Sequence, residues 1–385
     1  MASIYFSDEH EAFREVARRF IVAEVAPHAD EWEAARAIPR EIFTRMGQQG
    51  FLGITIPEAY GGTGADLFFG IAFLEELPRS MMGGFCAAVS VQQFMATPHI
   101  LCHGSEELKQ RYVAPSVKGE KIGALAISEP DIGSDVAALR TSAIRDGDHF
   151  VVNGAKTFIT NGATGDFYTL AVRTGKVAGA AGVSLLAVDA DSPGITSQSI
   201  DKLGWHASDT AEITFEDVRV PVNHLIGQEG RGFAMLMEAF QLERLAAATI
   251  AVGSAQVALE TTLSYMKSRE VFGSTLSSYQ ALRHRLADLE AELEAARQLT
   301  YHAAWLLQQG QPAAREASMA KLVTTELGKR VADECLQFHG GYGYMEEFPM
   351  ARLYRDARAA TLTAGTSEIM REIISRILID NHGDG

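Results

Sequence analysis

The spacing of the apolar residues changes twice along the 385-residue chain, and no other feature constrains the fold as strongly. Up to about residue 120 the apolar residues recur at the spacing of amphipathic helices. From about 121 to 225 they form short strand-like runs separated by Gly and Asp, and from about 230 to 380 long helical runs rich in Ala and Leu return. We therefore predict an α+β fold with an N-terminal α-helical domain (1–120), a middle β-barrel-like domain (121–229) and a C-terminal four-helix-bundle domain (230–385).

Local signals predict where the elements begin and end. Ser7 is a good N-cap, because Asp8 and Glu9 then lie at the positive end of the helix dipole. Further helices are expected from Pro39 to Gly50 and over 65–77, 85–102 with a kink at Pro98, 233–269, 279–308 and 314–338. Strands are expected over 122–127, 149–159, 167–172, 183–188 and 212–220, with a hairpin at Asp146-Gly147.

Composition narrows the class of protein. A formal net charge of −15 argues against nucleic acid and anionic membranes as main partners. No stretch looks apolar enough to span a bilayer, and the N-terminus does not have the pattern of a secretory signal. The three cysteines form no CxxC pair, which argues against a disulfide framework and favours a reducing compartment: Cys86, Cys102 and Cys335. We expect a cytoplasmic location, or the mitochondrial matrix if a transit peptide has been removed.

Several common site motifs are absent from the sequence. It contains no GxGxxG, GxxxxGK or GxSxG pattern, so nicotinamide Rossmann binding, P-loop chemistry and the serine-hydrolase elbow lose their usual support. His99 and His103 are four residues apart on a predicted helix, a spacing that can hold zinc. No acidic ligand accompanies them in an HExxH pattern, so surface or packed histidines are the favoured interpretation and no metal is expected.

Two segments of the middle zone lead from apolar strands into turns: Ile127-Ser128-Glu129-Pro130-Asp131-Ile132-Gly133-Ser134-Asp135 and Phe158-Ile159-Thr160-Asn161-Gly162. Backbone amides freed by such turns can bind a phosphate or a polar ring edge, although either segment alone is more often an ordinary turn. The third zone adds the motifs at 269–273, Gln280, 286–290, 337–344, 355–358 and 364–369. In this order and separation, the segments resemble the acyl-CoA dehydrogenase family over about residues 6–379. The helical, β-barrel, helical fold of that family agrees with the pattern of apolar residues.

The resemblance implies FAD as cofactor and assigns its contacts. Thr160 would bond near the reactive nitrogen of the flavin, and Arg269 would neutralise the pyrophosphate. In the family, several of the contacts come from a neighbouring subunit. The cofactor-binding residues implied are Leu125, Ile127, Ser128, Gly133, Ser134, Phe158, Ile159, Thr160, Arg269, Phe272, Gln280, Gln337, Gly340, Gly341, Thr366 and Glu368. The substrate-binding residues implied are Ser134, Gln241, Arg244, Ala364 and Gly365.

The chain departs from the family pattern at two positions. Phe158 stands where many members have Trp, and it still offers a flat apolar face to a flavin. Ala364 stands where many members have the catalytic Glu, and alanine cannot take a proton. The isovaleryl-CoA and long-chain subfamilies keep their base at a position that Glu243 resembles. Apolar neighbours of Glu243 and the absence of Lys or Arg three or four residues away predict a desolvated carboxylate with a raised pKa.

The resemblance implies α,β-dehydrogenation of an acyl-CoA to the trans-2-enoyl-CoA. Glu243 would remove the α-proton, and the electrons would pass to an electron-transfer flavoprotein. The position of the base favours a medium, long or branched acyl chain, and the long Ala/Leu-rich helices favour a homo-oligomer, a tetramer built as a dimer of dimers. The alternatives are a flavin oxidase or monooxygenase on the same fold and a non-catalytic protein that binds FAD and CoA.

Overall fold

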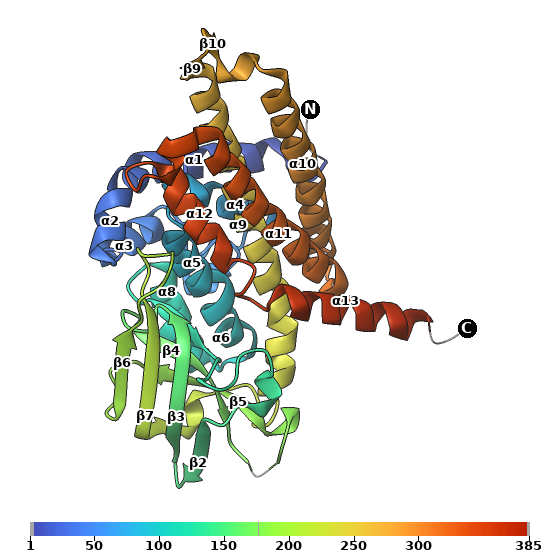
Figure 1. Ribbon diagram of the computed structural model, residues 1–385. Coiled ribbons are helices and arrows are strands. Elements are labelled where there is room, and N and C mark those ends of the chain that lie inside the picture. The colour runs from blue at the N-terminus through green and yellow to red at the C-terminus, as the bar shows by residue number, and fades with distance from the viewer. Residues whose placement is uncertain (1–3, 176, 383–385) are drawn as a thin grey trace.

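The computed structural model describes residues 4–175 and 177–382, and it has the predicted order of domains. Helices from both ends of the chain form one part of the molecule, and the β domain forms the opposite part (Figure 1). The α+β fold class is therefore confirmed. The sequence predicts that the N-terminal segment is not a secretory signal, and the first three residues of that segment, 1–3, lie outside the described range.

The N-terminal domain contains helices because its apolar residues share one face of each turn. The side chain of Ser7 accepts a hydrogen bond from the N–H of His10, which confirms the predicted N-cap. The helix expected over 85–102 is broken by a π turn at Gln92–Ala96, and Pro98 lies in the first turn of the next helix. The α-helices are α1 (Asp8–Glu24), α2 (Ala29–Ala35), α3 (Arg40–Gln48), α4 (Leu67–Glu76), α5 (Gly83–Val91), α6 (Thr97–His103), α7 (Glu106–Leu108) and α8 (Ala114–Val117).

The middle domain is an eight-stranded sheet with the order β6-β7-β3-β2-β4-β5-β8, and β1 pairs with β4 in parallel. One apolar cluster takes side chains from β1, β2, β3, β4, β5 and β7, so the sheet curls around a common core. The predicted hairpin is present, with Gly147 at a φ of 62° between β2 and β3. The strands are β1 (Gly123–Ala126), β2 (Ser142–Asp146), β3 (His149–Thr160), β4 (Phe167–Arg173), β5 (Val183–Asp189), β6 (Ile195–Ser199), β7 (Thr210–Pro221) and β8 (Leu225–Ile226).

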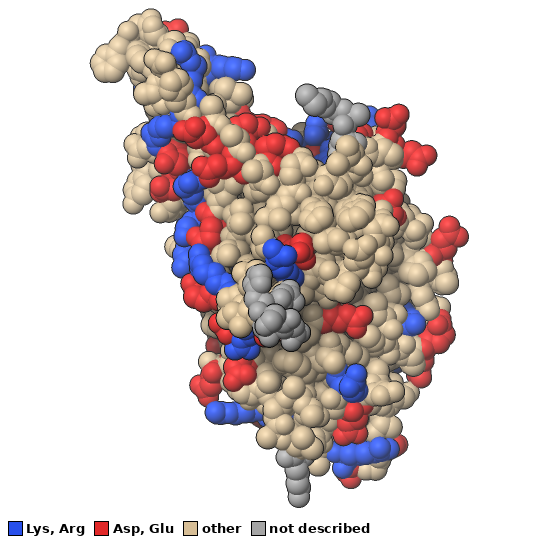
Figure 2. Space-filling model, turned by 90° about the vertical axis from the view of Figure 1, so that its right-hand side faces the viewer, with Lys and Arg blue, Asp and Glu red and all other residues tan. Residues whose placement is uncertain are grey.

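Three long helices form the centre of the C-terminal domain: α9 (Gly232–Ser268), α10 (Gln280–Gln308) and α11 (Ala314–His339). Between α9 and α10 the chain forms a hairpin of β9 (Glu270–Val271) and β10 (Ser274–Thr275). The helices α12 (Pro349–Ala359) and α13 (Ser367–His382) contact α11, and α13 then projects away from the body (Figure 1). On the face toward which α13 points, acidic and basic side chains are interspersed between wide uncharged areas (Figure 2).

Helix α9 corrects one sequence expectation. It is 37 residues long and, by length and composition alone, apolar enough to cross a membrane, whereas no such stretch was expected. Of the most apolar 18-residue stretch of this helix, 72% is buried inside the protein. The helix is apolar because it packs against other helices on most of its sides, as a core helix does.

The start of α9 joins the three domains. A buried cluster combines Ile100 of α6, Leu185 of β5 and Leu236 of α9. This packing fixes α6 against the first half of α9, where Glu243 lies. A polar contact joins the domains at another point, because the buried carboxylate of Asp356 on α12 accepts hydrogen bonds from the N–H groups of Gly83 and Trp205.

Candidate active site

A carboxylate is buried at the contact between α9 and α6. Glu243 on α9 is only 4% exposed, and its Oε1 lies 3.7 Å from Nε2 of His99 on α6. Burial raises the pKa of Glu243 above its ordinary value of 4.5, and His99 and Arg244 oppose part of this rise. The predicted burial and the predicted direction of the pKa are confirmed. A buried carboxylate with a raised pKa suits proton abstraction near neutral pH.

His99 is a partner of Glu243 that the sequence analysis missed. Its two ring nitrogens and Oε1 of Glu243 are buried without a hydrogen-bond partner in the described part of the chain. Buried polar atoms are nearly always paired in folded proteins, so this pair of side chains is suited to a bound molecule that completes the bonding. No spacing pattern within one helix reveals this contact, because His99 and Glu243 lie on helices far apart in the sequence.

His103 does not join His99 in a metal site. Its Nε2 lies 3.9 Å from the exposed carboxylate of Glu238, one turn along α6 from the contact of His99. Within residues 4–175 and 177–382, no group of three or more His, Cys, Asp or Glu side chains is arranged to hold a metal ion.

Two buried cations, Arg244 and Lys321, lie near one another, and Arg244 is next to Glu243 on α9. The guanidinium of Arg244 lies 5.6 Å from the ring centre of Phe240, and burial lowers the pKa of Arg244 below its ordinary value. Burial also lowers the pKa of Lys321 on α11 to about 8, and the charge of Arg244 lowers it further. This side of the site therefore carries positive charge, which favours negative charge on a bound molecule.

Residues 364–366 form a turn that leads into α13. Ala364 and Gly365 both have left-handed backbones, with φ of 52° and 88°. Nζ of Lys321 donates a 2.6 Å hydrogen bond to the carbonyl of Gly365. The hydroxyl of Thr366 accepts a hydrogen bond from the N–H of Ile369, so Thr366 caps α13.

Two other predicted residues make contacts within the protein. Oε1 of Gln241 accepts a hydrogen bond from the N–H of Ala313, just before α11. The carboxylate of Glu368 is exposed in the first turn of α13, 3.8 Å from Arg371. Their predicted contacts with substrate and FAD remain predictions.

A buried ion pair holds the turn after β1 against β3 in the β domain. Nζ of Lys156 donates 2.9 Å hydrogen bonds to the carbonyl of Ile127 and to the carboxylate of Glu129. The same carboxylate accepts hydrogen bonds from the N–H groups of Arg140 and Thr141. Burial lowers the pKa of Lys156 to about 8, although Glu129 opposes the change. Of the other predicted residues here, Leu125 and Ser128 are half-buried, and Gly133 and Ser134 are exposed in the turn.

A bulge near the end of β3 turns Phe158 outward. The register against β7 shifts between Lys156 and Ile159, and Phe158 has a φ of 59° and is 70% exposed. Its ring therefore offers a flat apolar face at the edge of the β domain. The side chain of Ile159 lies in the core of the domain, so only its backbone is placed to contact a cofactor. The half-buried hydroxyl of Thr160 forms no hydrogen bond within the described residues.

The remaining predicted cofactor residues gather around a different pocket. It has a volume of about 580 Å³, and its lining includes Arg269, Gly340 and Gly341. Phe272 lies in the neighbouring hairpin and is 99% exposed, and Gln280 and Gln337 are also exposed. Figure 1 shows this hairpin at one end of the molecule and the β domain at the other. One chain therefore does not bring the two groups of predicted FAD contacts together.

Both groups fit parts of a flavin dinucleotide. Among the described residues, Arg269 has no acidic partner within 4.0 Å, and its guanidinium lies 5.6 Å from the ring centre of Tyr342. A Cβ added at Gly340 or Gly341 would meet nothing within 4 Å, so the backbone there is open to a ligand. A free guanidinium beside open backbone suits a pyrophosphate. The exposed Phe158 ring and the free Thr160 hydroxyl suit the flavin ring.

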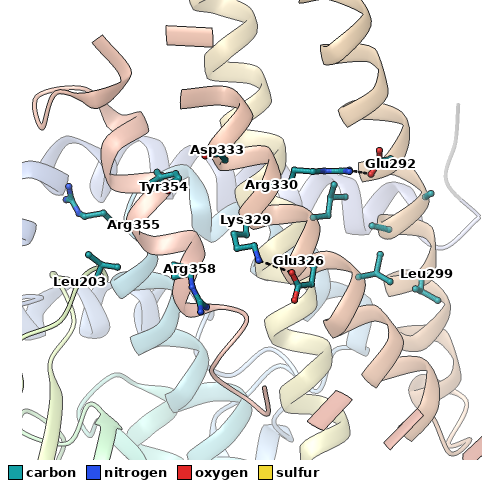
Figure 3. A pocket seen from close by; sticks show the side chains of 14 residues that line it. Leu203, Glu292, Leu299, Glu326, Lys329, Arg330, Asp333, Tyr354, Arg355 and Arg358 are labelled. Atoms are coloured by element: carbon teal, nitrogen blue, oxygen red, sulfur yellow. Dashed lines mark hydrogen bonds and ion pairs between the residues drawn. The ribbon is translucent and has the colours of Figure 1, made fainter. Parts of the chain in front are cut away.

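A larger groove lies away from Glu243. It has a volume of about 1200 Å³ and is lined by side chains of α10, α11 and α12, with apolar Leu299 beside charged Lys329 and Arg358 (Figure 3). None of the predicted catalytic, substrate or cofactor residues lines it.

The fold and the site together define a flavin-dependent oxidoreductase, and comparison with known proteins gives its family. Three family models match consecutive parts of the chain. They are the acyl-CoA dehydrogenase N-terminal domain at residues 7–120, the middle domain at 124–218 and the C-terminal domain at 230–379. The chain belongs to the acyl-CoA dehydrogenase family, so the predicted family and enzyme class are confirmed.

Relatives match over nearly the whole length. The mitochondrial long-chain specific acyl-CoA dehydrogenase of Sus scrofa is 40% identical, and the match covers 97% of this chain and 87% of the relative. The short-chain specific enzyme of Clostridium acetobutylicum is 38% identical, with 95% of this chain and 97% of the relative covered. The crystal structure of an acyl-CoA dehydrogenase from Geobacillus kaustophilus superposes with a TM-score of 0.95 at 41% identity, covering 98% of this chain and 100% of that chain.

The cofactor is FAD, as predicted. The family depends on FAD, and a similar structure is a glutaryl-CoA dehydrogenase from Mycobacterium smegmatis in complex with FADH2. That structure superposes with a TM-score of 0.92 at 29% identity, covering 99% of this chain and 97% of that chain.

Proposed function

We propose that Glu243 is the catalytic base of this acyl-CoA dehydrogenase and that the reaction converts an acyl-CoA thioester to its trans-2-enoyl-CoA. The single observation that carries the assignment is the burial of the Glu243 carboxylate, with a raised pKa, between α6 and α9. Ala364 occupies the other position where family members keep their base, and its methyl group cannot accept a proton. A rapid-mixing assay of flavin reduction with Glu243→Gln tests the assignment.

The roles of the protein groups follow from the chemistry of the thioester. The α-proton is only weakly acidic, so its removal by Glu243 requires donors for the negative charge that develops on the thioester oxygen. The backbone N–H of Ala364 supplies one donor, a role that needs no side chain. Arg244 and Lys321 add positive charge to this side of the site. FAD, held by groups such as Arg269 and Thr160, would supply the acceptor for the hydride that leaves the β-carbon.

We infer that the electrons pass on to an electron-transfer flavoprotein. Two similar proteins support this. The caffeyl-CoA reductase–Etf complex subunit CarC of Acetobacterium woodii is 35% identical, with 98% of this chain and 100% of the relative covered. A chain in the structure of the electron transferring flavoprotein of Acidaminococcus fermentans superposes with a TM-score of 0.95 at 36% identity. Slow reoxidation of the reduced enzyme in air, with fast reoxidation by an electron-transfer flavoprotein, is expected; fast reoxidation in air would instead indicate an oxidase.

For the substrate we propose a medium, long or branched acyl chain. The support is the position of the base on α9, where the long-chain and isovaleryl-CoA subfamilies also keep theirs. The relatives differ in the substrates that their names state, because long-chain and short-chain enzymes match at similar identity. A panel of straight and branched acyl-CoAs, compared by kcat/KM, tests the proposal; a maximum at butyryl-CoA would contradict it.

We also propose a homo-oligomer, most simply a tetramer that is a dimer of dimers. The two groups of predicted FAD contacts lie at opposite ends of one chain, so a complete site needs a second copy. The fully exposed ring of Phe272 and the projecting helix α13, with Ile379 69% exposed, are suited to burial against other copies. The groove of Figure 3 is a further surface of this kind. Light scattering that gives a monomer with FAD fully bound would contradict the proposal.

A further inference from the structure

A lysine is buried directly behind the turn that contains Ala364. Lys321 on α11 has no exposed surface, and its Nζ donates a 2.6 Å hydrogen bond to the carbonyl of Gly365. Among residues 4–175 and 177–382, no Asp or Glu oxygen lies within 4.0 Å of this amine, so Lys321 is not part of an ion pair. Within the part of the chain that the structure describes, the carbonyl of Gly365 is therefore the one hydrogen-bond acceptor of Lys321.

Burial of this lysine works against the stability of its charged form. Burial lowers the pKa of Lys321 to about 8, and the nearby charge of Arg244 acts in the same direction. An apolar side chain of the same length would avoid that cost. The distinctive property of Lys321 at this position is thus its ability to donate to Gly365.

The turn that Lys321 holds has an unfavourable backbone. Ala364 has a φ of 52°, a conformation that residues with a Cβ rarely adopt, and Gly365 follows with a φ of 88°. Such conformations persist only when the surrounding structure holds them. Since the bond from Lys321 fixes the peptide group that follows Gly365, it limits rotation of the turn that presents the N–H of Ala364.

We propose that Lys321 is a positioning residue: it holds the Ala364–Gly365 turn so that the N–H of Ala364 stays directed at the thioester oxygen of the substrate. The inference rests on the proposed function, in which that N–H stabilises the negative charge formed when Glu243 takes the α-proton. A displacement of about 1 Å in such a group can cost about 100-fold in rate. Lys321 acts through the backbone and does not touch the substrate.

The test compares Lys321→Met with Lys118→Met. Methionine keeps the length of the lysine side chain and removes the donor, whereas Lys118 is exposed at the end of α8 and is not one of the predicted site residues. Each protein is loaded with FAD, its flavin content and Tm are measured, and the rate of flavin reduction by acyl-CoA is followed by rapid mixing. A second readout uses 3-thiaoctanoyl-CoA, which can lose its α-proton but has sulfur in place of the β-carbon and cannot give up a hydride. Its bound enolate produces a long-wavelength absorption band with oxidised flavin.

With full FAD content, Lys321→Met is expected to reduce its flavin about 10- to 100-fold more slowly than the parent, with the apparent Kd for acyl-CoA changed less than the rate. The pH at which the 3-thiaoctanoyl-CoA band reaches half intensity should rise by about one unit, because the bound enolate is less stabilised. Lys118→Met should match the parent in both readouts. Parent-like reduction and enolate formation in Lys321→Met would overturn the inference, even if its Tm falls.

Two further outcomes separate the inference from the proposed function. If Lys321→Met does not fold or does not bind FAD, Lys321→Leu and Lys321→Arg decide, because leucine has no donor and arginine keeps one. Loss of turnover and of the enolate band in folded, FAD-loaded Lys321→Leu, with both present in Lys321→Arg, supports the inference. Equal behaviour of the two variants overturns it. If none of the acyl-CoAs tested reduces the flavin of the unmodified protein, the proposed function fails, and the inference fails with it.

Discussion

Oε1 of Glu243 lies 3.7 Å from Nε2 of His99, and neither atom has a hydrogen-bond partner among the described residues. Two effects on the pKa of Glu243 oppose each other: burial raises the pKa, and the neighbouring His99 lowers it. The net effect is a pKa above the ordinary 4.5, which makes the carboxylate a stronger base than an exposed glutamate.

The pH dependence of flavin reduction should report this pair. Because Glu243 must be deprotonated to act as a base, the reduction rate rises with pH through its pKa. The substitution His99→Leu removes a group that lowers that pKa, so the rising limb should move to higher pH. His103→Leu is the matched control, since His103 lies one turn away on α6 and faces Glu238. An unchanged limb in His99→Leu would show that His99 does not tune the base.

A mixed oligomer tests whether two chains build each FAD site. Glu243→Gln and Arg269→Gln chains with different tags can be co-expressed and the mixed species purified. If the two groups of contacts come from different chains, one site of each mixed dimer has both an intact Glu243 and an intact Arg269. The mixed dimer should then show about half the activity of the parent, while each variant alone shows little. Activity no higher than that of the pure variants would mean that each chain builds its own site.

The contact between domains at Asp356 should make stability depend on pH. Burial, followed by the charge of Glu33, raises the pKa of Asp356 from 3.8 to about 6. A carboxyl group that binds its proton more tightly in the folded state contributes stability that is fully present below pH 3.8 and is lost as the pH rises through 6. The loss is of the order of 3 kcal/mol at about 1.4 kcal/mol per pH unit.

Unfolding by denaturant between pH 4 and 7 measures this effect. Asp356→Asn should lose the part of the pH dependence that lies between pH 4 and 6, because the amide does not titrate. Asp201→Asn is the control, since Asp201 is exposed and its pairing with Arg36 lies at the surface. If Asp356→Asn keeps the pH slope of the parent, the raised pKa of Asp356 does not contribute to stability.

Local chemistry explains which parts of the fold were predictable. The N-cap at Ser7, the Asp146-Gly147 turn and the long helices of the C-terminal domain depend on residues close in sequence, and the sequence predicts them. Strand β6 was missed because four of its five residues are exposed, so it has no alternation of apolar and polar side chains. The π turn at 92–96 was also missed, since it has no strong local signal.

In the candidate site too, some features have a local signal in the sequence, and others arise only from tertiary packing. Burial of Glu243 was predictable from its apolar neighbours on α9, whereas its contact with His99 arises only when α6 packs against α9. The bond from Lys321 to Gly365 likewise joins two segments through tertiary packing. The outward turn of Phe158 depends on a register shift against β7, which no pattern within β3 reveals.

The most direct test of the account is the rate of flavin reduction by acyl-CoA in Glu243→Gln, measured by rapid mixing on protein with its full content of FAD. Glutamine keeps the shape of the side chain and cannot accept the proton, so the rate should fall by about 10⁴-fold, the upper end of the range for a lost general base. Adding Ala364→Glu to this variant should restore part of the rate, because both positions are expected to face the same α-carbon. Reduction of the flavin in Glu243→Gln at a rate close to that of the parent would contradict the assignment of Glu243 as the base.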